Sequence, residues 1–272
     1  MILSDIEKFS ADIADNDARN YISQEEAISP EAAGLRIFDT PIFGVAAADD
    51  PIFNTFRQPN VVGEIFRTPE TWLNGAVSVV SFFLSFSGEV RVSNRVSDEP
   101  SANWLHARIE GQEFVKKLTL ALCELIKKDG SFCVAPTFEP EFKMHVSEDR
   151  TVHSSTWSER HIAYAAGLGA FGLSRSFITK RGTAGRYSSL VTTLPLPPTP
   201  RESAYALDFC DKCGACVPRC PVGAIDAKTG MDKLICENYL EKMREKFRPR
   251  YGCGKCQTKV PCEHIMPGTA AR

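Results

Sequence analysis

The sequence contains no long hydrophobic run. Its longest apolar stretch, Ala76 to Phe86, reads AVSVVSFFLSF and is far shorter than the roughly 20 residues that a helix needs to cross a bilayer. The first residues, MILSDIEKFSADIADND, are acidic and amphipathic, and they lack the basic and apolar regions of a signal peptide. We therefore expect a cytoplasmic protein with no membrane segment.

An excess of charge of either sign is also missing. The chain has 32 Lys and Arg residues against 34 Asp and Glu residues, for a net charge of −2. Such a balance gives no overall field that would attract nucleic acid or a membrane. The chain of 272 residues is 43% hydrophobic and 24% charged, which is ordinary for a globular protein with one sizeable core and a small appendage.

Apolar runs and helical periodicity predict several elements before residue 200. Buried strands are expected over residues 41–48, 76–86, 131–135 and 186–194. Helices are expected up to about residue 28, over 103–128 and over 156–166. Thr156 and Glu159 have the spacing of a capping box that would open the last helix. The proline-rich stretch LPLPPTP, residues 194–200, predicts a stiff linker before a second domain.

Cysteine is abundant but unevenly distributed. Of ten cysteines, eight lie between Cys210 and Cys262, while Cys123 and Cys133 stand alone. A secreted disulfide protein spreads its cysteines over the whole fold, so this distribution favours a metal-binding domain at the C-terminal end. Cys123 falls in the expected helix and Cys133 in an apolar strand, where packed, inert thiols are expected.

The first half of the cysteine cluster has a specific spacing. Cys210-x2-Cys213-x2-Cys216-x3-Cys220, followed by Pro221, reproduces the run of bacterial ferredoxins that holds [4Fe–4S] clusters. Three cysteines at three-residue steps wrap one cube, and the fourth reaches the other cluster. A zinc site is the alternative, but this spacing with its proline favours iron and sulfur.

The remaining cysteines complete two sets of four. We assign one [4Fe–4S] cluster to Cys210, Cys213, Cys216 and Cys262, and the other to Cys220, Cys236, Cys253 and Cys256. The spacing of this second half is irregular, since five residues separate Cys256 from Cys262 and proline precedes Cys262. The assignment of Cys262 is therefore the one most in need of a structural test.

A basic segment accompanies the cysteines. Between Lys242 and Lys259 there are seven basic residues and one acidic residue, Glu245. One interpretation is a docking patch for an acidic redox partner or an RNA backbone, with Arg248, Arg250 and Lys255 as its core. The other interpretation, which we favour, is a solvated face whose charge offsets the anionic clusters.

The order of motifs after residue 150 resembles the epoxyqueuosine reductase and reductive dehalogenase superfamily. The matching stretches are SERHIA at 158–163, AGLGAFG at 166–172, RYSSLVTTLPL at 186–196, the ferredoxin run, and YGCGKC at 251–256. The resemblance implies an α+β fold in which a nitroreductase-like domain binds cobalamin and precedes a ferredoxin-like domain with two [4Fe–4S] clusters. In that family the corrin cobalt is reduced through the two clusters and then attacks the substrate.

The resemblance also implies site residues. Gly167, Gly169, Gly172 and Arg186 are expected to bind the cofactor. The glycines formally match a dinucleotide fingerprint, but they follow a helix rather than a strand, and we reject that interpretation. His153 occupies the position of the aspartate that epoxyqueuosine reductases are thought to use as proton donor. We therefore expect His153 to be the general acid.

Together these features predict residues 1–204 as the cobalamin-binding domain and residues 205–272 as the ferredoxin-like domain. The leading interpretation is a cobalamin-dependent iron–sulfur reductase of a small or modified substrate, supplied by a low-potential donor such as ferredoxin or flavodoxin. The rival is an accessory electron carrier that serves a partner protein, and a third alternative places flavin in the larger domain. The chain ends ten residues after Cys262, without the long extension that epoxyqueuosine reductases use on tRNA, so we do not expect tRNA as a partner.

Overall fold

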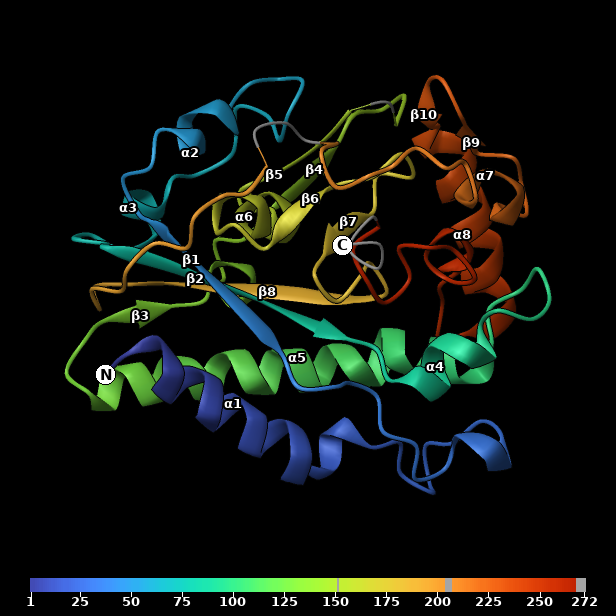
Figure 1. The fold of residues 1–272 in the computed structure, drawn as a ribbon, viewed down its shortest axis with the longest axis horizontal. Helices are drawn as coiled ribbons and strands as arrows, with labels where there is room; N and C mark the ends of the chain where they lie inside the picture. The colour runs from blue at the N-terminus through green and yellow to red at the C-terminus, as the bar shows by residue number, and fades with distance from the viewer. Residues whose placement is uncertain (151, 204–206, 268–272) are drawn as a thin grey trace.

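A four-stranded antiparallel sheet lies at the centre of the larger part of the chain (Figure 1). In spatial order it contains β1 (Ile42–Ala47), β2 (Ser78–Ser85), β8 (Gly185–Thr192) and β3 (Cys133–Val134). Val80 pairs with Val45 on β1 and with Leu190 on β8. β2 is buried at every position because it has strands on both sides and helices on both faces. This computed structural model describes residues 1–150, 152–203 and 207–267.

Shorter elements surround the sheet. The helices are α1 (Leu3–Asn16), α2 (Ile52–Thr55), α3 (Pro69–Trp72), α4 (Gly88–Ser93), α5 (Ala102–Lys128), α6 (Glu159–Ala165), α7 (Cys216–Arg219) and α8 (Lys233–Phe247). The hairpins pair β4 (Met144–Val146) with β5 (His153–Ser155), β6 (Gly169–Phe171) with β7 (Phe177–Thr179), and β9 (Ile225–Asp226) with β10 (Gly230–Met231). Short 3₁₀ turns cover Ala18–Asn20, Pro30–Ala32, Pro136–Phe138 and Lys255–Gln257.

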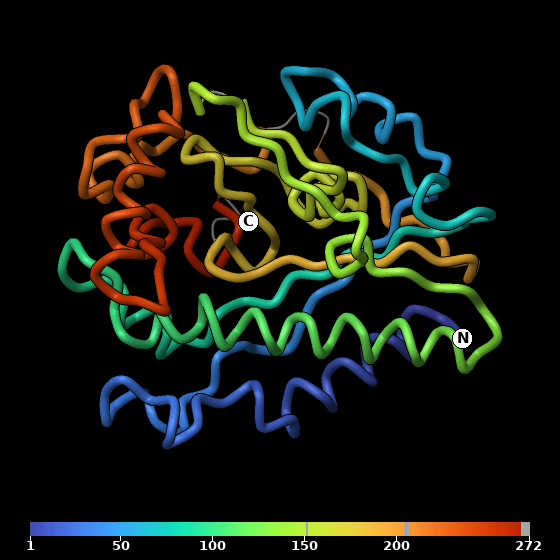
Figure 2. The backbone as a smooth tube through the Cα atoms, turned by 180° about the vertical axis from the view of Figure 1, so that it is seen from behind, coloured from blue at the N-terminus to red at the C-terminus, as the bar shows by residue number. Residues whose placement is uncertain are grey.

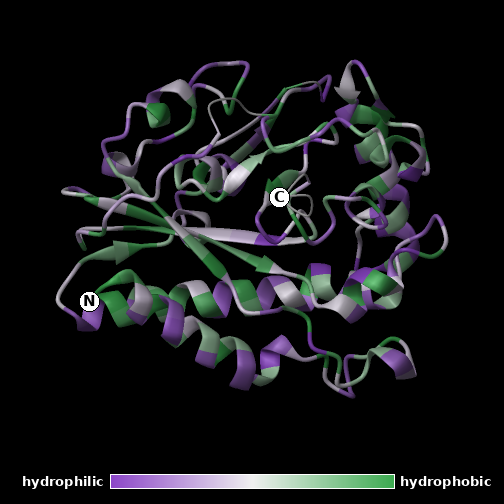
Figure 3. Cartoon of the chain, viewed as in Figure 1, coloured by the Kyte–Doolittle hydropathy of each residue, from purple (hydrophilic) through white to green (hydrophobic). Residues whose placement is uncertain are grey.

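Helices cover both faces of the sheet. α5 packs on one face and α1 lies against α5, as the view from behind shows (Figure 2). α6 covers the other face, where it contacts β1, β2 and β8. Side chains of a strand alternate between faces, so Val80 joins the core with Phe114 of α5, whereas Val79 joins the core with Ile162 of α6. Figure 3 shows this burial as hydrophobic strands between helices of mixed polarity.

The long helix α5 confirms its prediction from sequence. It begins after Ser101, whose hydroxyl accepts a hydrogen bond from the Trp104 N–H at 3.2 Å. It ends at Lys128, before Gly130 with φ +91°. Among the described residues, no helix is long and apolar enough to cross a membrane.

Two local predictions were wrong. The expected N-terminal helix ends at Asn16 rather than near Ile28. The expected capping box is absent: α6 begins after Ser158, and the Thr156 hydroxyl instead accepts a hydrogen bond from the Lys143 N–H at 2.9 Å. The Glu159 carboxylate turns away from the helix end to bind other side chains, and this difference has consequences for the site.

The proline-rich stretch 194–200 packs against the sheet. The Leu196 N–H donates to the Ser78 hydroxyl at 3.0 Å, and the Thr199 N–H donates to the Val45 carbonyl at 2.8 Å. Leu194 is buried as well. The stretch is therefore a strap held across the sheet. The predicted domain boundary between residues 204 and 205 falls outside the described residues.

Candidate functional site

The eight clustered cysteines separate into two groups of four in space. One group lines a small cavity of about 20 Å³ and contains Cys210, Cys213, Cys216 and Cys262. The other lines a cavity of about 470 Å³ and contains Cys220, Cys236, Cys253 and Cys256. The two groups have the same members as the two ligand sets expected from the sequence, and their binding of clusters stays a prediction.

The first group is held by backbone from the larger domain. The Leu173 N–H points to the Cys210 sulfur at 3.5 Å, and the Cys262 carbonyl accepts a hydrogen bond from the Thr183 N–H at 2.9 Å. Burial, followed by the neighbouring Cys210 and Cys216 thiols, raises the pKa of Cys262 to about 12. A bare Cys262 thiol would therefore stay protonated at neutral pH, and iron would have to displace its proton.

The residue after Cys262 fixes this loop to α4. The buried Glu263 carboxylate accepts two hydrogen bonds from Arg95, at 2.7 and 3.0 Å, and one from the Lys259 N–H at 2.6 Å. Burial alone would raise the pKa of Glu263, but these donors outweigh it and hold the pKa below its usual value. The bidentate pair thus ties the Cys262 loop to the larger domain.

The second group is held by Asn94, which lies at the C-terminus of α4 and is fully buried. Its side-chain amide donates to the Cys253 carbonyl at 3.0 Å. Its carbonyl accepts a hydrogen bond from the buried Lys255 ammonium at 2.9 Å, which also donates to the Val96 carbonyl at 3.0 Å. The Ala224 N–H points to the Cys220 sulfur at 3.2 Å. These contacts fix the loop around the second group without any metal.

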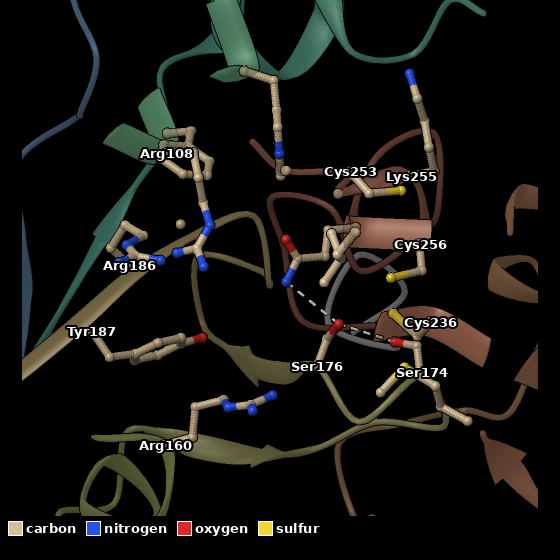
Figure 4. Close-up of a pocket in the computed structure, with 18 of the residues that line it drawn as sticks. Arg108, Arg160, Ser174, Ser176, Arg186, Tyr187, Cys236, Cys253, Lys255 and Cys256 are labelled. Carbon is tan, nitrogen blue, oxygen red and sulfur yellow. Dashed lines mark hydrogen bonds between the residues drawn. The ribbon is translucent and has the colours of Figure 1, made fainter. Parts of the chain in front are cut away.

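The larger cavity lies between this second group and the sheet (Figure 4). Its apolar walls include Phe86, Trp104, Phe138 and Leu240. Its polar groups include Arg108, Gln112, Glu159, Arg160, Arg186 and Tyr187. Most of these residues come from α5, α6, β8 and the cysteine-rich part of the chain, whereas Phe86 follows β2 and Phe138 belongs to the 3₁₀ turn Pro136–Phe138. The cavity can therefore hold a ligand with an apolar body and polar edges, directly beside four thiols.

Glycine permits the close packing at the cavity wall. Gly254 has φ +66°, and a Cβ there would overlap the Trp104 indole ring. Gly252 also lies against Trp104, where a Cβ would stand 3.5 Å from the ring. Only glycine combines this left-handed backbone with so close an approach. The Cys253 and Cys256 loop can therefore lie flat on α5.

Glu159 is a functional candidate that the sequence did not reveal. One of its carboxylate oxygens accepts a hydrogen bond from the Ser189 hydroxyl at 2.6 Å, and the other accepts one from the Thr137 hydroxyl. Ser189 itself accepts a hydrogen bond from the Trp157 indole at 2.9 Å. Burial raises the pKa of Glu159 to about 7 despite these two donors. The group can therefore hold a proton at neutral pH beside the cavity.

The predicted general acid His153 is not among the residues that line this cavity. Its imidazole lies 3.1 Å from the Glu237 carboxylate of α8, and Arg150 donates to the same carboxylate at 3.3 Å. These contacts connect the β4–β5 hairpin to α8. The catalytic role of His153 remains a prediction, and its surroundings are those of a residue that joins two elements.

The three predicted cofactor glycines also lie apart from the larger cavity, whereas Arg186 lines it. A Cβ at Gly169 would overlap the Ile178 carbonyl, and a Cβ at Gly167 would stand 2.8 Å from the Pro200 carbonyl oxygen. Gly172 lines the small cavity of the first cysteine group. Their lack of a side chain therefore has a packing explanation, and their role in cofactor binding stays an untested prediction.

Two other groups of residues have internal partners. In the basic segment, Lys255 is buried and Arg250 pairs with Glu110 of α5. Neither is free to form the docking patch considered from the sequence. Cys123 and Cys133 are buried with their sulfurs 3.0 Å apart. The hydrogen bond with Cys123 and then burial raise the pKa of Cys133, so the Cys133 thiol stays protonated.

Comparisons with known proteins find similarities in both the larger part of the chain and the cysteine-rich part. Residues 206–226 match the family of 4Fe-4S binding domains. The epoxyqueuosine reductase of Salmonella typhimurium is 28% identical over 212 residues, which cover 73% of this chain and 51% of that relative. The chain thus spans about half the length of this curated relative.

Two solved structures share the fold. A crystal structure of epoxyqueuosine reductase gives a TM-score of 0.51 at 20% identity, over 82% of this chain and 61% of the other. A catabolic reductive dehalogenase gives 0.55 at 16% identity, over 83% of this chain and 30% of the other. At these identities the likeness establishes the α+β fold.

One expectation from the sequence was wrong. We did not expect tRNA as a partner, yet the curated relatives are epoxyqueuosine reductases. The point at which this sequence ends is therefore no ground for excluding tRNA. In sequence and in fold, this iron–sulfur protein resembles the epoxyqueuosine reductases and reductive dehalogenases.

Proposed function

We propose that the protein is an iron–sulfur reductase that binds cobalamin in the larger cavity and reduces a small or modified substrate there. The observation that carries this proposal is the position of the cavity. It is bounded on one side by the second group of cysteines and on the other by polar residues of α5, α6 and β8. Electrons and a ligand would therefore meet in one enclosed space.

The cysteine groups fit two [4Fe–4S] clusters. Each group offers four thiols, the number that a cube requires. Backbone N–H groups of Leu173 and Ala224 point at cysteine sulfurs, as expected for residues that tune a cluster.

The larger cavity fits the chemistry of cobalamin. A corrin has a broad apolar face and a rim of amide groups, and the cavity pairs aromatic walls with the donors of Gln112, Arg186 and Ser176. The Arg186 Nε is buried with no partner among the described residues, and a rim oxygen would satisfy it. Bound cobalamin supplies a cobalt ion that can be reduced to a strong nucleophile.

The order of the two cysteine groups suits the passage of electrons. Cys213 of the first group is exposed, so a low-potential donor such as ferredoxin or flavodoxin can approach there. The second group is more enclosed and lines the cavity. The electron donor would therefore bind near the first cysteine group and the substrate near the second.

Glu159 is the residue that we propose as proton source. Its carboxyl group lies at the cavity, and its pKa of about 7 lets it carry a proton under neutral conditions. Two alternatives are weaker. The Tyr187 hydroxyl already donates to the Phe177 carbonyl at 2.7 Å, and burial together with Arg160 lowers the pKa of His161 to about 4.

Epoxyqueuosine carried by tRNA, the substrate class of the named relatives, is our candidate substrate.

Titration with cobalamin tests this function. Anaerobic protein with both clusters should bind cob(II)alamin and change its optical and electron paramagnetic resonance spectra. Leu240→Trp should prevent binding because the indole would fill part of the cavity, whereas Leu234→Trp on the exposed side of α8 should not. Unchanged spectra of the unmodified protein at high micromolar cobalamin would refute the proposal and favour the accessory electron carrier.

A further inference from the structure

Three guanidinium groups converge on the larger cavity from three different elements. Arg108 comes from α5, Arg160 from α6 and Arg186 from β8. In Figure 4 all three point into the same space, on the side opposite Cys236, Cys253 and Cys256. Like charges that face one cavity repel one another, so this arrangement favours a bound group of opposite charge.

Within the described part of the chain, none of the three arginines is paired with a carboxylate. Arg108 donates to the Tyr251 hydroxyl at 3.1 Å, and Arg160 donates to the Arg175 carbonyl at 2.7 Å. Arg186 donates to Gln112, and its Nε is buried without a partner. All of these partners are neutral, so most of the N–H donors of the three guanidinium groups remain available to a ligand.

The electrostatics of the cavity favour an anion. Arg160 is exposed at the surface of the molecule and also lines the cavity. Partial removal from water lowers the pKa of Arg160, and repulsion from Arg108 and Arg175 lowers it further. Glu159 offers only a weak counter-charge, because burial raises its pKa to about 7. An anion bound among the three arginines would offset the repulsion between their charges.

We propose that Arg108, Arg160 and Arg186 bind an oxyanion, a carboxylate or a phosphate, on a ligand whose apolar part lies against Trp104 and Phe138. Arginine forks match both groups in shape and charge. Assigning this oxyanion to the substrate rests on the proposed function, whereas the binding of the anion does not.

Equilibrium dialysis of anaerobic protein with both clusters tests the site without cobalamin. The probes are labelled inorganic phosphate and labelled benzoate, each used separately. We expect one anion bound per chain. Arg160→Gln and Arg186→Gln should each weaken binding about tenfold or more, as loss of a charge-assisted hydrogen bond implies. Arg57→Gln, at an exposed position away from the cavity, should leave binding unchanged. Arg186→Lys keeps the positive charge but loses the paired donors of the guanidinium group. Its affinity for the anion should lie between those of the unmodified protein and Arg186→Gln.

The two probes distinguish the sources of the oxyanion. Tighter binding of phosphate indicates a phosphorylated ligand, and tighter binding of benzoate indicates a carboxylic acid. Absence of stoichiometric binding of either probe, or binding that survives the cavity variants with iron content intact, overturns the proposal. In that case the arginines only balance the clusters, and Arg160→Gln would shift the cluster potentials alone. Failure of the cobalamin titration with intact anion binding would refute the proposed function and leave this site standing.

Discussion

The carboxyl group of Glu159 depends on its surroundings for its chemistry. Two hydroxyl donors, Ser189 and Thr137, hold it, and burial still raises its pKa to about 7. Ser189 has one hydrogen to give, and its acceptor position is taken by the Trp157 indole. The hydroxyl is therefore oriented toward Glu159, which fixes the carboxyl group in one position beside the cavity.

Glu159→Gln should remove the acidic proton of this side chain while keeping its size and shape. We expect turnover to fall about a hundredfold or more, as is typical when a general acid is lost. The unmodified protein should lose activity above about pH 7 as Glu159 ionises, and the variant should show no such limb. The measurement is the pH profile of turnover. A full-activity variant with an unchanged profile would exclude Glu159 as proton source.

The stability of the folded protein should also fall as the pH rises and Glu159 ionises. Because burial raises the pKa of Glu159 from 4.5 to about 7, the folded state holds this proton more tightly than the unfolded state. Its stabilising contribution is complete below about pH 4.5 and is lost as the pH rises to about 7. The melting temperature should therefore differ less between pH 5 and pH 8 in the variant than in the unmodified protein.

At this scale the run from Cys210 to Cys220 could be recognised from its spacing. The partners of the later cysteines stay a prediction, because their spacing is irregular. Arg108 could be placed on a helix by periodicity, but nothing local indicates that it lines the same cavity as Arg186 of β8. Glu159 was interpreted as a capping residue because its spacing from Thr156 matched that pattern, and only tertiary packing shows its real partners.

Among the elements, the loop that carries Cys253 and Cys256 is the most tightly specified. Gly254 allows it to lie on the Trp104 ring, and Lys255 fastens it to Asn94. Alanine at position 254 would need both a strained left-handed backbone and the space of the indole ring. The loop would have to lift away from α5, with its two thiols.

Gly254→Ala should therefore impair assembly of the second cluster, and Gly75→Ala offers a matched control. Gly75 has φ +73°, so alanine is strained there too, but no atom lies within 4 Å of its added methyl group. Strain alone costs about 1 kcal/mol. We expect close to four irons per chain in the first variant and close to eight in the second. Equal iron contents in the two variants would contradict the role given to Trp104.

The main elements of the sheet and α5 could be predicted because their patterns are long. The expected strand 76–86 contains β2, and the expected helix 103–128 differs from α5 by one residue at its start. The β6–β7 hairpin was missed because its strands have only three residues each. Its glycines were assigned to a cofactor, whereas Gly169 avoids a clash inside the hairpin itself.

For the molecule as a whole, the two parts of the chain share one set of buried polar contacts. Asn94 and Arg95, which follow α4, bind the Cys253 loop and Glu263 respectively. Arg250 reaches α5 through Glu110. Such buried contacts belong to a domain interior more than to a mobile interface. We therefore expect the larger and smaller parts to unfold together.

Lys255→Met tests this coupling because it keeps the length of the side chain and removes its three hydrogen bonds. We expect a loss of about 2 kcal/mol, or roughly 5 °C in the melting temperature of the whole chain. Lys242→Met, at an exposed position of α8, should have little effect. Scanning calorimetry should show one transition that shifts as a unit. Two transitions, with only one shifted, would mean that the parts unfold separately.

The proline-rich strap has a consequence for how separate molecules behave toward one another. β1 is an outer strand of the sheet, and an unpaired strand edge invites another chain to add to it. The strap occupies this edge: the Thr199 hydroxyl accepts from the Val45 N–H at 3.0 Å, and the Thr199 N–H donates to the Val45 carbonyl. The prolines on either side carry no N–H group, so they cannot extend the ladder outward. A segment that looks like a simple linker thus guards the protein against aggregation through its sheet.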